Sequence, residues 1–202
     1  MITGLEKVLL HSPHSDDIEL AMGATISKLI RYNVKVSIAI FSFGLDRKSL
    51  EKEFNKSMNI FRIRNIYKHI FPVREFNKYR QNILSHLVEF NKSKFDIIFC
   101  PSEFDKHQDH KIIYDESMRA FKNSSIICYE SDWNNLGFIS NAFVEIEQED
   151  FDKKMKSLSC YESQKDKKYF SLEYQKGLAS TRGIKSRNSN YAEAFYIKKL
   201  NL

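Results

Sequence analysis

Apolar runs and amphipathic stretches alternate along the first two thirds of the chain. Short apolar runs that are typical of buried strands occupy residues 7–11, 34–43, 68–73, 96–100 and 125–129. Between them, apolar side chains recur at helical spacing in residues 18–32, 48–64, 79–91 and 110–122. Strands joined by helices of this length form right-handed crossovers, so the pattern predicts a parallel sheet covered by helices on both faces.

The last third of the chain continues with shorter elements. We predict a strand at residues 143–146, a helix at 151–161 and a closing strand at 194–197. The predicted fold class is therefore a doubly wound, mostly parallel α/β sandwich of the Rossmann-like type. No Gly-x-Gly-x-x-Gly segment follows the first strand, so a dinucleotide site is not indicated.

Composition supports one folded domain spanning residues 1–202. Of the 202 residues, 42% are hydrophobic and 29% are charged, which excludes a disordered or collagen-like chain. With Gly 6 and Pro 3, little of the chain is available for a flexible linker. The three cysteines are an odd number without close spacing, so they indicate buried free thiols rather than a disulfide framework.

The formal net charge of +6 leaves two interpretations open. Basic residues alternate with acidic ones, which is typical of a solvated surface, but the excess also favours an anionic, phosphorylated or nucleotide-linked substrate. No nucleic-acid-binding module is recognisable, and we expect no nucleic-acid partner. The first residues lack the regions of a secretory signal, and no apolar run approaches about 20 residues, so we expect a cytoplasmic protein without a membrane span.

Two loops carry residues suited to chemistry, and both follow predicted strands. In a parallel sheet, ligands bind beyond the carboxyl ends of the strands. In the first loop, His14 and Asp17 are three residues apart and can bind the same ion. A histidine from the second loop, residues 101–110, would complete two imidazoles and one carboxylate, the ligand set of many catalytic zinc sites. One loop alone would equally suit a capped helix, whereas the two together favour a metal site.

The same loops contain recognisable motifs. Residues 13–17 read Pro-His-Ser-Asp-Asp, with Leu20 and Gly-Ala-Thr at 23–25 after them, and residues 105–110 read Asp-Lys-His-Gln-Asp-His. Further segments are Tyr-Glu at 129–130, Tyr-Glu-Ser-Gln at 161–164, Arg-Gly at 182–183 and Tyr-Ala-Glu-Ala-Phe at 191–195. In these motifs and their order, the chain resembles the PIG-L/LmbE-like zinc N-deacetylases from about residue 8 to residue 197.

The sequence departs from that family's pattern at three places. Ser15 stands where proline is usual, and Ala24 replaces the second glycine of a pair. An aspartate often found after the third strand, and thought to contact sugar hydroxyls, is not evident at residues 71–74. These departures concern the substrate rather than the chemistry.

The resemblance implies a ligand set and a general base. His14, Asp17 and His110 would bind zinc, and Asp16 would act as the base. Zinc lowers the pKa of a bound water to about 7, and a neighbouring carboxylate can take the water's proton as it attacks an acetamide carbonyl. Asp16 is adjacent to a ligand and cannot easily face the same side of the metal, which suits a base.

Two more residues of the second loop are expected to take part in catalysis. By resemblance, His107 would polarise the carbonyl and stabilise the oxyanion. Asp109 would hold His107 in its protonated form by hydrogen bonding. Alternatively, Asp109 has a structural role as a favourable negative charge at a helix N-terminus.

Four residues are candidates for binding substrate: Arg74, Arg80, Trp133 and Arg182. The three arginines follow or lie near predicted strand ends or the closing turn, and a solvated or turn-closing arginine is the alternative in each case. The tryptophan follows a strand end and would either stack on a sugar or anchor its loop.

The resulting functional prediction is a zinc-dependent hydrolase that removes the acetyl group from an N-acetylated amino sugar, with metal-bound water as the nucleophile. By resemblance, the sugar could be nucleotide- or lipid-linked and belong to surface-polysaccharide biosynthesis, and the protein could form a homo-oligomer. Fe²⁺ or Co²⁺ could replace Zn²⁺ at such ligands. Two alternatives stay open: a metal-dependent phosphoesterase, which would need two ions, and a catalytically idle sugar- or metal-binding protein.

Overall fold

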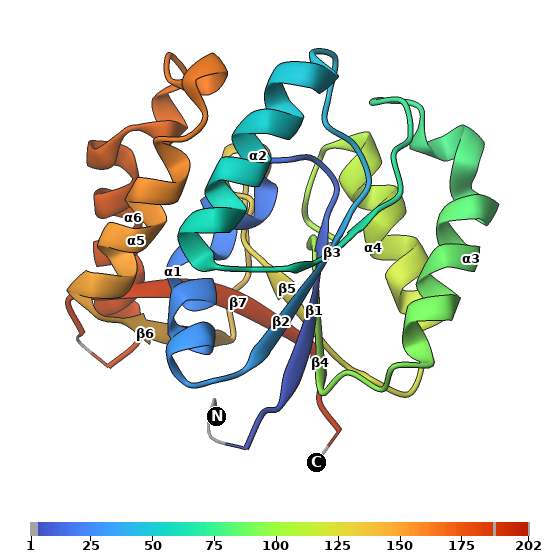
Figure 1. The fold of residues 1–202 in the computed structure, drawn as a ribbon. Coiled ribbons are helices and arrows are strands. Elements are labelled where there is room, and N and C mark those ends of the chain that lie inside the picture. Colours follow the sequence, from blue (N-terminus) through green and yellow to red (C-terminus); the bar gives the residue numbers. More distant parts are fainter. Residues whose placement is uncertain (1–3, 188, 202) are drawn as a thin grey trace.

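The computed structural model describes residues 4–187 and 189–201 as a seven-stranded sheet flanked by helices (Figure 1). In chain order the strands are β1 (Lys7–Ser12), β2 (Lys35–Ile40), β3 (Asn65–Lys68), β4 (Ile97–Cys100), β5 (Ser125–Tyr129), β6 (Ala142–Ile146) and β7 (Tyr191–Lys199). The helices are α1 (Asp17–Arg31), α2 (Arg47–Phe61), α3 (Arg80–Asn91), α4 (Gln108–Ala120), α5 (Gln148–Leu158) and α6 (Leu172–Lys185). Four 3₁₀ turns complete the described elements: η1 (Phe76–Tyr79), η2 (Asp132–Asn134), η3 (Glu162–Gln164) and η4 (Lys168–Phe170).

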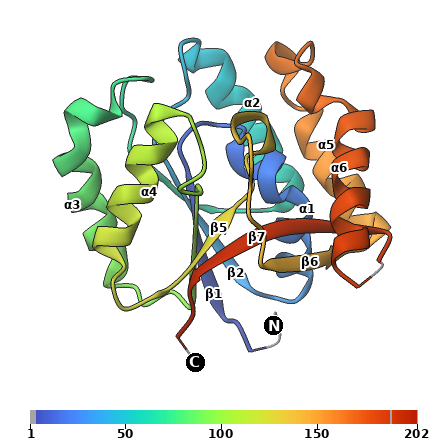
Figure 2. The ribbon, with the colours of Figure 1, turned by 180° about the vertical axis from the view of Figure 1, so that it is seen from behind.

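The strand order is β3-β2-β1-β4-β5-β7-β6, and the first five strands run parallel. β7 is antiparallel to both of its neighbours. Helices α1, α2 and α5 cover one face of the sheet, and α3 and α4 cover the other (Figure 2). The doubly wound, mostly parallel fold predicted from the sequence is therefore confirmed.

Alternate residues of the central strand enter two separate cores. Val8 and Leu10 pack with the α1 and α2 side chains, whereas Leu9 packs with those of α3 and α4. All three side chains are fully buried. A central parallel strand is apolar on both faces for this reason, which is why residues 7–11 read as a continuous apolar run.

Helix α1 is kinked at Met22, and an ion pair from distant parts of the chain forms hydrogen bonds with the backbone groups near the kink. The Glu193 carboxylate in β7 accepts hydrogen bonds from the amides of Ala24 and Thr25, at 3.2 and 2.6 Å. Lys154 of α5 donates to the Leu20 carbonyl oxygen at 2.7 Å and to Glu193 at 2.8 Å. The backbone groups freed by the kink thus keep partners, as buried polar groups require.

Two predicted strands have different bounds in the structure, and one helix was not predicted. The third strand is Asn65–Lys68 rather than 68–73; this edge strand is largely exposed and lacks a clear apolar pattern. Helix α6 was not predicted, because two glycines and a threonine interrupt it and its apolar stripe is weak. The closing strand is longer than predicted, at Tyr191–Lys199.

Within the described ranges, no helix has both the length and the apolarity needed to cross a membrane.

Candidate metal centre

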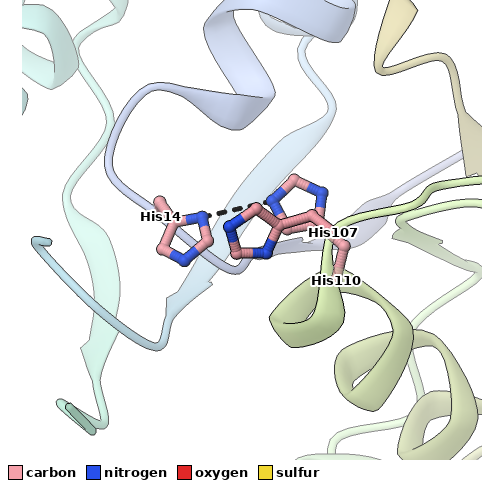
Figure 3. Close-up of side chains that lie close together, drawn as sticks. All are labelled: His14, His107 and His110. Atoms are coloured by element: carbon pink, nitrogen blue, oxygen red, sulfur yellow. Dashed lines mark hydrogen bonds between the residues drawn. The ribbon is translucent and has the colours of Figure 1, made fainter. Parts of the chain in front are cut away.

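The two predicted loops meet because their strands are neighbours. β1 and β4 pair in parallel, so the loop before α1 and the loop before α4 leave the same edge of the sheet. His14 lies in the first loop, and Asp17 opens α1. His107 is the N-cap of α4, and His110 lies in its first turn. Figure 3 shows the imidazole rings of His107 and His110, from the second loop and α4, close to the ring of His14 from the first loop.

Three donor atoms form a compact triangle. His14 Nδ1 lies 3.1 Å from His110 Nε2. Asp17 Oδ2 lies 3.3 Å from His14 Nδ1 and 3.1 Å from His110 Nε2. Ligand atoms that bind zinc tetrahedrally at about 2.0–2.1 Å stand about 3.3 Å apart, so the triangle has the dimensions of such a site.

A carboxylate holds the far nitrogen of each ring in the triangle. His14 Nε2 lies 3.0 Å from Asp109 Oδ2, and His110 Nδ1 lies 2.6 Å from Asp105 Oδ2. When each ring is neutral, the carboxylate accepts the proton of that nitrogen, and the nitrogen in the triangle keeps a lone pair with which it can bind a metal ion. Metal-binding histidines are oriented in this way, so the residues present fit a divalent ion such as Zn²⁺, Fe²⁺ or Co²⁺.

His107 is the alternative third donor. Ligand atoms of His14, His107 and His110 all lie within 4.8 Å of one another. However, His107 Nδ1 already accepts a hydrogen bond from the Asp109 amide at 3.2 Å. The Asp17 oxygen lies 3.3 and 3.1 Å from the His14 and His110 nitrogens, so the set His14, Asp17 and His110 has the spacing of ligands on one ion.

The charged groups of the triangle strongly shift one another's pKa values. Burial lowers the pKa of His110, but Asp17 and Asp105 outweigh burial and raise that pKa to about 10. Burial raises the pKa of Asp17, but His110 and His14 reverse this effect and hold it far below its usual range. A cation bound at the triangle would lie within this cluster of charged side chains.

Asp16 stands beside the triangle without entering it. It is the N-cap of α1, yet its side chain makes no capping hydrogen bond, and the residue lines the adjoining pocket. Burial and the neighbouring Asp17 raise the pKa of Asp16 to about 6, with Lys167 and His14 opposing the rise. A partly exposed carboxylate with this pKa can accept a proton near neutral pH.

The predicted pairing of Asp109 with His107 is wrong. The Asp109 carboxylate contacts His14, and it also accepts hydrogen bonds from the amides of Arg74 and Phe76 at 2.7 and 3.4 Å. Burial and the nearby His110 and His14 lower the pKa of His107 to about 4. Because Nδ1 of the neutral ring accepts the Asp109 amide proton, the ring carries its own proton on Nε2. His107 is thus a neutral hydrogen-bond donor.

A pocket of about 490 Å³ opens over the triangle. One part of its wall is apolar, with Phe43, Leu45, Leu50 and Val73. The other part contains Trp133, whose indole stacks on the Tyr169 ring at 5.4 Å with an angle of 15°. Two aromatic rings beside polar side chains are a surface that a sugar ring can stack on.

The four substrate-binding candidates separate into two pairs. Arg74 and Trp133 line the pocket. Arg80 instead forms an ion pair with Glu116 at 2.6 Å, and Arg182 forms a bidentate ion pair with Glu130. Neither Arg80 nor Arg182 is among the residues that line the pocket.

Several pocket residues were missed by the sequence analysis: Phe43, Leu50, Ser163, Gln164, Lys167 and Tyr169. Of the last four, Ser163 and Gln164 belong to the Tyr-Glu-Ser-Gln motif and Lys167 and Tyr169 follow it, so that motif was the available signal. Their nearness to the metal loops depends on how α5 and α6 pack, and no local sequence pattern encodes that packing.

Comparisons with known proteins identify a family that this chain matches. A family model described as GlcNAc-PI de-N-acetylase matches residues 9–121. An Escherichia coli K12 protein described as the uncharacterized deacetylase YaiS is 24% identical over 167 residues, which cover 77% of this chain and 90% of that protein.

Solved structures share the fold at low identity. N,N'-diacetylchitobiose deacetylase from Pyrococcus horikoshii superposes with a TM-score of 0.81 at 20% identity and covers 97% of this chain and 85% of its own. Teicoplanin deacetylase Orf2 gives 0.74 at 13% identity, with 94% and 96% covered.

The same fold also carries other chemistry. GalB, the 4-carboxy-2-hydroxymuconate hydratase from Pseudomonas putida KT2440, gives a TM-score of 0.77 at 16% identity, with 98% of each chain covered. The structural matches therefore establish the fold, and the family model carries the assignment. Because that model spans more than half of the chain, the protein belongs to the PIG-L family of de-N-acetylases.

Proposed function

We propose that this deacetylase is a zinc-dependent hydrolase that removes the acetyl group from an N-acetylated amino sugar. The observation that carries the proposal is the triangle of His14 Nδ1, Asp17 Oδ2 and His110 Nε2, with Asp16 beside it in an open pocket. A metal held by two imidazoles and one carboxylate retains a position for water and substrate.

Each nearby residue has a separate task in amide hydrolysis. The bound ion would supply Lewis acidity and lower the pKa of water. Asp16 accepts the proton of the attacking water and later returns it to the departing amine nitrogen. The Nε2–H group of His107 donates a hydrogen bond to the carbonyl oxygen as negative charge develops there. Asp105 and Asp109 keep the two ligand rings oriented.

The pocket wall supports a sugar as the amine portion of the substrate. Stacked Trp133 and Tyr169 offer an aromatic surface, and Ser163 and Gln164 add hydrogen-bonding groups beside it. The names of two similar structures refer to deacetylases of chitobiose and teicoplanin. We extend this substrate class to the present chain, including sugars linked to a nucleotide or a lipid.

The contacts of Asp105 and Asp109 weigh against the phosphoesterase alternative. A two-metal phosphoester site needs further carboxylates for its second ion. Asp105 and Asp109 are the candidates in the second loop, and both already hold ligand histidines. Among residues 4–187 and 189–201, a single group of three or more metal-binding side chains occurs, and it consists of His14, His107 and His110.

Acetate release from a panel of N-acetyl sugars tests the proposed function. The panel contains N-acetylglucosamine, N-acetylgalactosamine, diacetylchitobiose and uridine diphosphate N-acetylglucosamine, and phosphate release from p-nitrophenyl phosphate is measured in parallel. Wild-type protein should release acetate from at least one of them, and Asp16→Asn should lower that rate at least 100-fold. Phosphate release without acetate from any of the sugars would contradict the proposal.

A further inference from the structure

Two exposed cations at the pocket, Arg74 and Lys167, have no carboxylate partner among the described residues. Several basic side chains contact buried carboxylates: Arg31 contacts Asp150, Arg80 and Arg119 contact Glu116, Lys154 contacts Glu193, and Arg182 contacts Glu130. Arg74 and Lys167 both line the pocket, and neither makes an ion pair with a carboxylate of residues 4–187 or 189–201.

The backbone holds Arg74 in place from both sides. Its φ is 67°, a left-handed conformation that costs a non-glycine residue about 1 kcal/mol or more. Its amide donates to Asp109 Oδ2 at 2.7 Å, and its carbonyl oxygen accepts from Gln108 Nε2 at 2.6 Å. The same Asp109 oxygen contacts His14. The position of Arg74 is therefore coupled to that of the metal triangle.

Lys167 lies in a different part of the wall, between η3 and η4. Its Nζ is 5.6 Å from the centre of the Tyr169 ring, and its charge acts on Asp16. The segment that carries Arg74 and the segment from η3 to η4 lie on opposite sides of the first metal loop (Figures 1 and 2). Both segments contribute to the lining of the pocket over the triangle, so a substrate bound there lies in the electric field of both cations.

We propose that Arg74 and Lys167 bind a phosphate group on the substrate, so that the preferred substrate is a phosphorylated N-acetyl amino sugar. This inference rests on the proposed function. Asp16, Asp17 and Asp46 line the same pocket and repel an anion, so a phosphate needs cations that no carboxylate has already neutralised. A guanidinium matches two phosphate oxygens, and an ammonium acts as a point charge on another.

Phosphate fits the arrangement better than a carboxylate does. A carboxylate has two oxygens in one plane, which one arginine can satisfy. A phosphate or diphosphate presents more oxygens in several directions and can contact groups on two sides. The net charge of +6 adds long-range attraction for such an anion.

The test compares acetate release from neutral and phosphorylated forms of one sugar. The substrates are N-acetylglucosamine, its 1-phosphate, uridine diphosphate N-acetylglucosamine and a short-chain alkyl diphosphate N-acetylglucosamine. Wild-type protein should favour at least one phosphorylated form over the neutral sugar by tenfold or more in kcat/KM. The last two substrates distinguish a nucleotide-linked source from a lipid-linked one.

Variants assign the preference to the two cations. Arg74→Met and Lys167→Met should each lower the ratio of phosphorylated to neutral kcat/KM about tenfold, the usual size of one charge-assisted contact. Lys165→Met is the matched control, since Lys165 is exposed on the same segment and lies near Glu162. It should keep the wild-type ratio. The ratio cancels any effect of Lys167 on Asp16, because both substrates use the same base.

Two failures are distinguishable. If the wild-type ratio is near one, or if Arg74→Met and Lys167→Met leave it unchanged, the phosphate inference is overturned while acetate release still supports the proposed function. If no sugar releases acetate, the proposed function fails, and calorimetric binding of N-acetylglucosamine 1-phosphate decides the remaining question. Equal dissociation constants for wild type and Lys167→Met would then overturn the inference.

Discussion

The Tyr161 hydroxyl donates a hydrogen bond to the carbonyl oxygen of Ser15, the residue between His14 and Asp16. The same hydroxyl lies 2.6 Å from Glu19 Oε1, which also accepts from Ser57 Oγ at 2.7 Å. Tyr161 precedes η3, so the segment that forms one wall of the pocket is joined directly to the first metal loop. The last third of the chain therefore helps to position residues near the beginning.

Tyr161→Phe should lower stability because it removes this contact while keeping the buried ring. The Ser15 carbonyl would lose its partner in a buried site, which costs about 1–3 kcal/mol of unfolding free energy. Urea unfolding measures the change. Tyr32→Phe is the matched control, since Tyr32 is 47% exposed, and it should change stability by less than about 0.5 kcal/mol. Equal effects of the two substitutions would contradict the role of the Tyr161 hydroxyl.

Asp105→Asn should weaken metal binding although Asp105 is not itself a proposed ligand. Asp105 holds His110 Nδ1 at 2.6 Å, and the loss of such a partner typically reduces metal affinity about 10- to 100-fold. Competition with a chromophoric zinc chelator measures the affinity. Asp115→Asn on the same helix α4 is the control, because Asp115 contacts Arg80 and Lys111 instead. An affinity equal to that of the control would show that Asp105 does not orient the ligand.

His11 should make the protein less stable in mild acid. Burial lowers the pKa of its imidazole to about 3, against about 6.5 in the unfolded chain. The unfolded chain therefore binds more protons between these values, and stability falls as pH decreases through this window. Between pH 7 and pH 5 this group alone costs about 2 kcal/mol. Nδ1 contacts Ser117 Oγ at 2.8 Å, and Nε2 is buried without a hydrogen-bond partner among the described residues.

The variant His11→Gln tests this prediction. Unfolding free energies of the metal-free proteins are compared at pH 7 and pH 5. The wild type should lose about 2 kcal/mol more than the variant over this interval, because all other groups titrate in both proteins. The same loss in both proteins would assign the acid sensitivity to other residues.

Lys154→Met should strongly destabilise the fold. Lys154 and Glu193 form a buried ion pair at 2.8 Å, and this pair also forms hydrogen bonds with backbone groups at the kink of α1. Removal of one partner from a buried pair typically costs about 3–5 kcal/mol because the remaining charge stays buried. Urea unfolding checks the value against Lys156→Met, an exposed position on the same helix. A loss below about 1 kcal/mol for Lys154→Met would contradict the role of the pair.

The central sheet could be predicted because its strands are buried on both faces. Residues 7–11 and 96–100 are largely apolar runs followed by polar loops, and this pattern places both loops at the carboxyl ends of strands. That the two strands are neighbours is a finding of the structure. The edge strand β3 lacks the pattern because it is exposed, and α6 contains glycines that weaken its helical signal. The sequence therefore predicts strands that are buried on both faces better than it predicts an exposed edge strand or a helix that contains glycines.

The site could be predicted in part for a similar reason. His14, Asp17 and His110 are identified by residue type and loop position, and the structure brings these three together. The partner of Asp109 was mistaken, because the choice between His14 and His107 depends on side-chain directions that spacing does not encode. Lys167 was missed because its approach to the pocket follows from long-range packing of the last third.

Metal content of the purified protein tests the central claim most directly. It is measured by mass spectrometry of the elements in wild type, Asp17→Ala and Asp16→Ala after gentle purification and dialysis. We predict about one divalent ion per chain in wild type and in Asp16→Ala, and a large loss in Asp17→Ala, because Asp17 Oδ2 completes the triangle whereas Asp16 stands outside it. No ion in the wild type, two ions per chain, or full retention in Asp17→Ala would contradict the assignment of the metal centre.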